Sequence, residues 1–111
     1  MSITKTVLTP DTFGFSVNGV SADASGTEEL VATPGAGKYL HLRHVTINSG
    51  AGITITLLEG ASAILGPVTY AAGTTLQWNF NPSIKLAANT ALNVDASGAG
   101  DVMVFVQGFM S

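Results

Sequence analysis

The residues best able to do chemistry are two histidines beside an arginine, at His41, Arg43 and His44. Imidazoles this close could hold a transition metal or transfer protons. In an extended strand, residues three apart point to opposite faces, so the two rings meet only if a bulge realigns them. Zinc also needs more ligands than these, and the chain has no cysteine. We therefore expect no metal site, and expect both rings to form hydrogen bonds on a partly buried strand.

Other catalytic patterns are also missing. The acidic residues are dispersed, and only Glu28 and Glu29 are adjacent, where strand geometry turns them apart. The segment Gly35-Ala-Gly-Lys38 departs from a phosphate-binding loop, because Ala32 replaces a required glycine and Tyr39 replaces the serine or threonine. No Gly-x-Ser-x-Gly or His-Glu-x-x-His motif occurs. The sequence predicts no enzyme activity, no catalytic residue and no cofactor.

Aromatic side chains could instead stack on a sugar. Trp78 lies between Gln77 and Asn79, the only tight group of a ring with amides. Trp78 nevertheless shares strand parity with Leu76 and Phe80, which favours a core position. A carbohydrate- or receptor-binding module, such as the tip of a tail fibre, remains the alternative reading. A jelly-roll enzyme of the cupin kind would need clustered His and Glu ligands, which two histidines of opposite parity do not supply.

Charge and hydropathy restrict the partners. The four basic residues, Lys5, Lys38, Arg43 and Lys85, are too scattered to neutralise a phosphate backbone, and the net charge is −3. No apolar run approaches the ~18 residues of a membrane helix. The N-terminal segment lacks the apolar core of a secretory signal. We expect no nucleic acid and no membrane as partner, and synthesis in a cytosol.

The elements that must position these residues are strands. Apolar residues recur mostly with period two, and Gly, Asn, Ser or Pro clusters separate them, which is typical of an all-β chain. Eight or nine short antiparallel strands favour a β-sandwich; without a cysteine pair or an early Trp, a jelly roll is preferred over an immunoglobulin fold. The expected strands cover residues 12–20, 28–33, 38–48, 53–58, 64–70, 74–80, 84–86, 92–94 and the segment from 101 onward.

Two strands have unusual patterns. Between residues 38 and 48 the apolar parity changes after Leu42, which predicts a bulge or bend at Arg43 and His44. The last strand is apolar on both faces, with three valines on one and Met103, Phe105 and Phe109 on the other. One face can fill the core of the chain. Because 46% of the residues are hydrophobic and only 10% charged, we predict that the second face forms a seam between copies of the chain.

Three segments carry a resemblance to a known family: Ala71-Ala-Gly-Thr-Thr-Leu76, Phe80-Asn-Pro82 and Leu86-Ala-Ala-Asn-Thr-Ala-Leu-Asn-Val94. Their rhythm of turns and core residues, followed by a last strand, resembles the small jelly-roll head decoration (cement) proteins of tailed bacteriophages. The resemblance runs from Lys38 onward, and residues 1–33 have no counterpart.

The resemblance implies a structural protein of the virion. Such proteins assemble in the host cytoplasm, form homotrimers, and bind the major capsid protein lattice on the capsid exterior to stabilise the phage head. From the length of 111 residues we expect a single domain at 13–111. We expect residues 1–12 to form an N-terminal arm, which in such proteins is often the part that touches the capsid. The apolar residues expected to dock on the capsid are Ile3, Val7, Leu8, Phe13 and Phe15.

Overall fold

The computed structural model describes residues 4–7, 14–21, 26–98 and 100–111. These residues form strands and turns, and among them there is no helix that is long and apolar enough to cross a membrane. The described residues form nine strands, which are β1 (Thr4–Val7), β2 (Gly14–Ser21), β3 (Gly26–Val31), β4 (Leu40–Ser49), β5 (Thr54–Glu59), β6 (Ser62–Thr69), β7 (Thr74–Lys85), β8 (Leu92–Ala96) and β9 (Val102–Met110).

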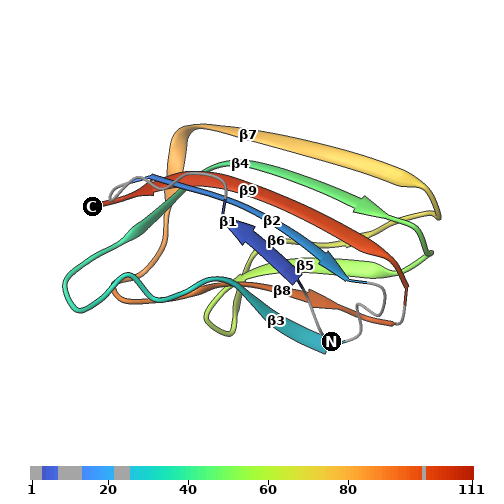
Figure 1. Cartoon of the computed structure of the whole chain (residues 1–111), viewed down its shortest axis with the longest axis horizontal. Helices are drawn as coiled ribbons and strands as arrows, with labels where there is room; N and C mark the ends of the chain where they lie inside the picture. Colours follow the sequence, from blue (N-terminus) through green and yellow to red (C-terminus); the bar gives the residue numbers. More distant parts are fainter. Residues whose placement is uncertain (1–3, 8–13, 22–25, 99) are drawn as a thin grey trace.

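The strands lie in two sheets that pack face to face (Figure 1). One sheet has the order β1-β2-β9-β4-β7 and the other the order β3-β8-β5-β6. The pairs are nested, because β2 pairs with β9, β3 with β8, β4 with β7 and β5 with β6, all antiparallel. Four nested pairs rolled into two sheets are the defining topology of a jelly roll. The predicted antiparallel β-sandwich of jelly-roll type is therefore confirmed.

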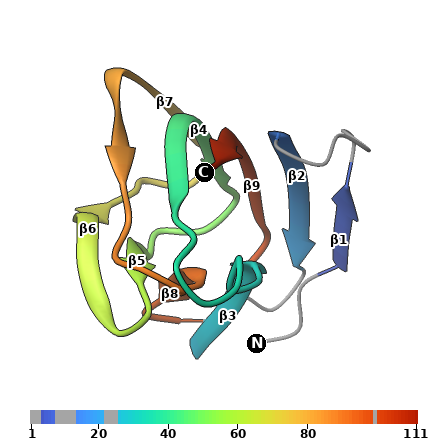
Figure 2. The same cartoon turned by 90° about the vertical axis from the view of Figure 1, so that its left-hand side faces the viewer.

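The first strand is an addition to the eight strands of the roll. β1 lies beside β2 at one edge of the five-stranded sheet, and β7 forms the other edge (Figure 2). Its register places Val7 opposite Val17. The described part of the expected N-terminal arm is thus an edge strand of the sandwich, while the rest of residues 1–12 lies outside the described residues.

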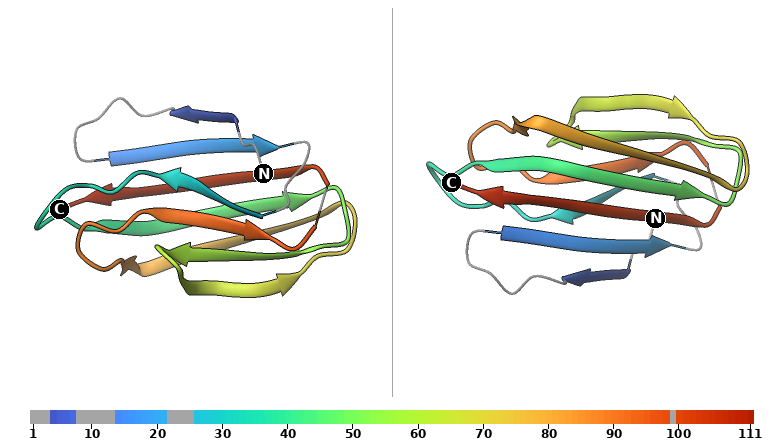
Figure 3. Two further views of the ribbon diagram at one scale, coloured as in Figure 1. Left: turned by 90° about the horizontal axis from the view of Figure 1, so that it is seen from below. Right: turned by 90° about the horizontal axis from the view of Figure 1, so that it is seen from above.

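The core fills the space between the two sheets. Along β5 the expected alternation is confirmed, because Ile55 and Leu57 are 1% and 0% exposed. In β9 the three valines face the same interior, and β9 lies between β2 and β4 (Figure 3). The buried apolar side chains of the described residues are Phe15, Val17, Leu30, Leu40, Leu42, Val45, Ile47, Ile53, Ile55, Leu57, Tyr70, Leu86, Leu92, Val94, Ala96, Val102, Val104 and Val106.

One strand is longer than the sequence predicted. β7 continues through Asn81 and Pro82, where the pattern predicted one strand to end and another to follow. Proline cannot donate to a ladder, but β7 is an edge strand with only β4 to pair with, so the interruption is tolerated. Pairing with β4 stops at Asn79 and resumes at Ile84. The stretch of β7 between Asn79 and Ile84, which does not pair with β4, contributes to the site described next.

Candidate functional site

A β-bulge at Arg43 organises the outer face of the five-stranded sheet. Leu42 pairs with Gly108 and His44 with Gln107, so Arg43 has no opposing residue on β9. The predicted bulge is confirmed. It inserts one residue into β4 and reverses the strand's parity.

The reversal brings the two histidines to the same face. Leu42 and Val45 both point into the core and are fully buried. His41 pairs with Phe109, and His44 pairs with Gln107. Both of these β9 side chains lie on the outer face of the sheet, so the two histidines lie there too. The realignment that the sequence analysis required for a shared histidine site is therefore present, because the bulge turns both rings to one face. Among the described residues, however, no group of three or more His, Cys, Asp or Glu residues could hold a metal ion.

Each imidazole has partners of its own, as expected for a partly buried strand. His41 Nε2 lies 2.7 Å from Ser111 Oγ, and its ring stacks on Phe109 at a centroid distance of 4.3 Å. His44 Nδ1 lies 2.7 Å from Asn79 Oδ1, and His44 Nε2 lies 2.6 Å from Thr46 Oγ1. The predicted hydrogen bonds are confirmed for both rings.

The partners of His44 determine its tautomer. Asn79 Oδ1 can only accept, so His44 Nδ1 carries the proton and donates it. His44 Nε2 then accepts from the hydroxyl of Thr46. Both nitrogens are occupied, which fixes the ring and leaves no free lone pair for a metal. The Nδ2 amide group of Asn79 keeps two donors for another partner.

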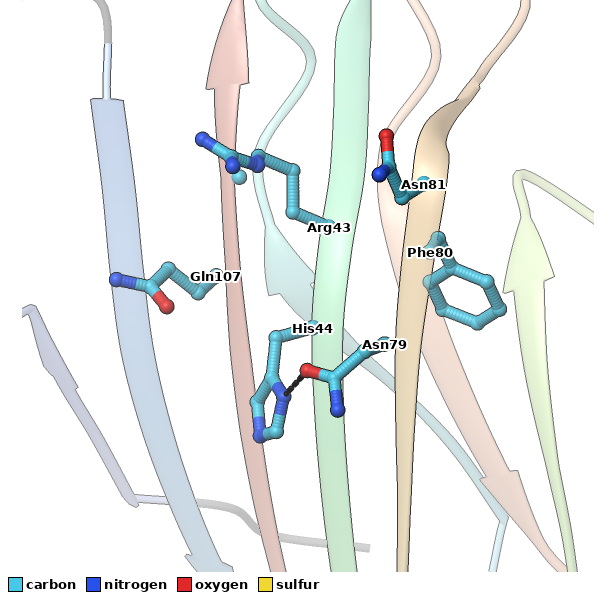
Figure 4. Close-up of a pocket in the computed structure, with 7 residues that line it drawn as sticks. Arg43, His44, Asn79, Phe80, Asn81 and Gln107 are labelled. Atoms are coloured by element: carbon cyan, nitrogen blue, oxygen red, sulfur yellow. Dashed lines mark hydrogen bonds between the residues drawn. The ribbon is translucent and has the colours of Figure 1, made fainter.

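A pocket of about 480 Å³ opens over the bulge (Figure 4). We call it the bulge pocket. Arg43 and His44 come from β4, Asn79 and Asn81 from β7, and Gln107 from β9, so three neighbouring strands contribute to it. In Figure 4 the guanidinium of Arg43 lies over β9, and the amide of Gln107 extends from β9 toward β2, away from the two asparagines. The lining residues are Arg43, His44, Asn79, Phe80, Asn81, Gln107 and Gly108.

Hydrogen-bond donors outnumber acceptors in the bulge pocket. The side chains of Arg43, Asn81 and Gln107 make no hydrogen bond or ion pair with any other described residue. None of the lining residues is acidic. The pocket therefore carries the positive charge of Arg43 on a chain whose net charge is −3. Arrangements of this kind favour acceptor-rich, anionic groups.

The tight group of Trp78, Gln77 and Asn79 is divided between two faces. Trp78 pairs with Val45, is half-buried and packs against the core, as its parity predicted. Gln77 and Asn79 point outward, and only Asn79 reaches the bulge pocket. The sequence reading missed Asn81 and Gln107. The parity change at Arg43 was the one signal that pointed to their location.

The residues expected at the seam lie on the outer face. Met103, Phe105 and Phe109 are half-buried, and part of their cover comes from the chain itself. The ring of Phe105 lies 5.9 Å from that of His44, and Phe109 is stacked by His41. Val20, which pairs with Met103, is the exposed large hydrophobic residue of the described chain, at 49%. The uncovered apolar surface is thus at the Val20 end of this face, away from the bulge.

Most of the expected capsid-docking residues lie outside the described residues. This applies to Ile3, Leu8 and Phe13, while Val7 is placed only as part of the β1 backbone. Phe15 is 5% exposed and belongs to the core cluster. Its side chain fills the sandwich because its parity in β2 is the inward one, so we remove it from the docking set.

No model of a protein family matches the sequence, and no curated protein matches it. Solved structures with some likeness include an RmlC-like cupin family protein with a double-stranded β-helix fold from Methanocaldococcus jannaschii (TM-score 0.45, 12% identity, covering 97% of this chain and 80% of that one). Others are an RmlC-like cupin protein from Desulfovibrio desulfuricans (TM-score 0.39, 11% identity, 94% and 80%) and a cupin domain from Bordetella pertussis Tohama I (TM-score 0.41, 11% identity, 98% and 93%). At these scores we draw no functional argument from the likeness.

Proposed function

We propose that this chain is a capsid decoration protein of a tailed bacteriophage, which trimerises and binds the major capsid protein lattice to stabilise the head. The observation that carries the proposal is the apolar end of the outer sheet face, where Val20 is 49% exposed beside Met103 and Phe105. An exposed valine beside two half-buried apolar side chains gives this end of the face a surface suited to contact with another protein. The family resemblance supplies the kind of assembly.

The segments that carry the resemblance lie at turns and core positions of this fold. Residues 71–76 include the turn that leads into β7, and residues 80–82 lie in the part of β7 that does not pair with β4. Residues 86–94 connect β7 to β8 and include buried Leu92 and Val94. A likeness built of turn and core positions is what two jelly rolls with similar loops would share.

The subunit seam is tested with charge at the apolar end of the face. We expect Val20→Asp and Phe105→Asp to lower the sedimenting mass from trimer to monomer, because a buried carboxylate without a partner is costly. Gln77→Asp is the matched control, since Gln77 is exposed on the same sheet near its other edge. Val20→Asp alters an exposed position, so the fold should persist and circular dichroism should match the parent chain. An 11.3 kDa parent particle, or folded variants of unchanged mass, would refute the seam.

Capsid binding is tested by co-sedimentation with phage shells that lack this protein. We expect saturable binding at a fixed ratio to the major capsid protein. Deletion of residues 1–12 should abolish it while thermal unfolding remains cooperative. Absence of saturation with the parent chain would contradict the proposal, and unchanged binding after the deletion would place the capsid contact elsewhere.

A carbohydrate- or receptor-binding module is the second candidate. The observation in its favour is the bulge pocket, which presents unpartnered amide and guanidinium donors on an exposed sheet face. A glycan array separates the two candidates, because a decoration protein needs no glycan, whereas a receptor-binding module would retain a defined set of them.

A further inference from the structure

We propose that the bulge pocket binds an acidic saccharide unit, that is, a sugar ring bearing a carboxylate. The inference extends the second candidate function. It does not depend on capsid decoration, because the pocket and the exposed Val20 lie at different ends of the sheet face.

The charge of the pocket selects an anion. Arg43 is exposed, and its guanidinium makes no ion pair with the described residues. A planar guanidinium pairs with a carboxylate through two parallel N–H···O bonds, so an unpaired arginine is well suited to that group. His44 cannot supply an acceptor for a neutral ligand, since both ring nitrogens are already bonded.

The spread of the donors selects a ligand larger than one carboxylate. Gln107, Arg43 and Asn79 come from three consecutive strands, and neighbouring strands lie about 4.8 Å apart, so the set spans roughly 10 Å. A single carboxylate engages only one point on this span. A sugar acid offers several oxygens around a ring and can accept from Asn79 and Asn81 on one side and from Gln107 on the other. The pocket volume of about 480 Å³ is within the usual range for small ligands.

The orientation of one donor, the Asn79 amide, is fixed before the ligand arrives. The hydrogen bond from His44 Nδ1 to Asn79 Oδ1 orients the Asn79 amide, and the bond from Thr46 holds the imidazole. The Asn79 donors are thereby committed to the pocket. Fixed donors on paired strands lower the entropy cost of binding compared with donors on a loop.

The test is a titration of the folded full chain by ¹H–¹⁵N NMR with sodium glucuronate, with glucose and sodium acetate at matched ionic strength as comparisons. We expect glucuronate to shift the side-chain amide signals of Asn79, Asn81 and Gln107 and to saturate. Glucose and acetate should each bind at least about tenfold more weakly, because glucose lacks the carboxylate and acetate lacks the sugar ring. Arg43→Gln should weaken glucuronate binding by about tenfold or more.

Lys85→Gln is the matched control. Lys85 is an exposed cation on the same sheet, but its ammonium lies over the Tyr39 ring at 4.0 Å and does not line the pocket. Its removal should change glucuronate affinity by less than about twofold. The inference is overturned if glucose or acetate binds as tightly as glucuronate, if Arg43→Gln and Lys85→Gln have equal effects, or if no pocket signal shifts. None of these outcomes bears on the sedimentation of Val20→Asp, so the two proposals fail separately.

Discussion

Replacing Tyr70 by phenylalanine should stabilise the protein. Tyr70 is 2% exposed in the core, and its hydroxyl has no hydrogen-bond partner among the described residues. A buried hydroxyl without a partner costs about 1–3 kcal/mol relative to water, whereas the ring contributes favourable burial. Tyr70→Phe removes the hydroxyl and keeps the ring. We expect the free energy of unfolding to rise by about 1 kcal/mol, and Tm by about 4 °C for a domain of this size.

The same hydroxyl makes stability depend on pH in the alkaline range. Desolvation by burial raises the pKa of Tyr70 from 10.0 to about 12. The unfolded chain therefore loses this proton at a lower pH than the folded chain does. The contribution of Tyr70 to stability is fully present below pH 10 and is lost as pH rises through 12. The decline amounts to about 3 kcal/mol when complete. Tyr70→Phe should lack this part of the decline.

The assay is urea unfolding at one fixed protein concentration, repeated at several values of pH, because assembly would make stability depend on concentration. Tyr39→Phe is the control, since Tyr39 is only half-buried. The reasoning fails if Tyr70→Phe destabilises the protein by more than about 1 kcal/mol, because such a loss would require a hydrogen bond to the hydroxyl.

Three further predictions concern packing. Gly108→Ala should lower the free energy of unfolding by about 1–3 kcal/mol or more, because a Cβ there would collide with the His41 carbonyl and the Phe15 ring. Gly52→Ala is the control, since its Cβ would lie 3.7 Å from the nearest atom, and its thermal melt should match that of the parent chain. Leu57→Ala, at a position with 0% exposure, should lower the free energy of urea unfolding by about 2–5 kcal/mol, and a smaller loss would mean that the site can collapse. A double-mutant cycle of His41→Ala and Phe109→Ala should give a coupling of about 0.5–1.5 kcal/mol for the stacked rings, and zero coupling would contradict the stacking.

Much of the fold was predictable because burial follows strand parity. The alternation from Ile53 to Leu57 identified β5 and its inward face, and the parity change after Leu42 located the bulge. The end of β7 was misplaced because Asn81 and Pro82 resemble a turn. Only the edge position of β7, which the sequence does not reveal, allows the strand to continue.

The candidate site was far less predictable. Arg43, Asn79 and Gln107 are distant in sequence, and they meet only because β4 lies between β9 and β7. No local pattern encodes that order. The contacts of Phe105 and Phe109 with the imidazoles could not be predicted for a similar reason, because they depend on the direction in which the bulge turns His41 and His44.

The position of β9 has a consequence for how the molecule forms. β2 and β4 are not neighbours, and they are joined only through β9, which is translated after both. During synthesis on the ribosome, the edges of β2 and β4 that pair with β9 therefore stay unpaired until β9 emerges. Because such long-range pairing delays folding to milliseconds or seconds, these unpaired strands are open to aggregation and to chaperones until β9 pairs with them.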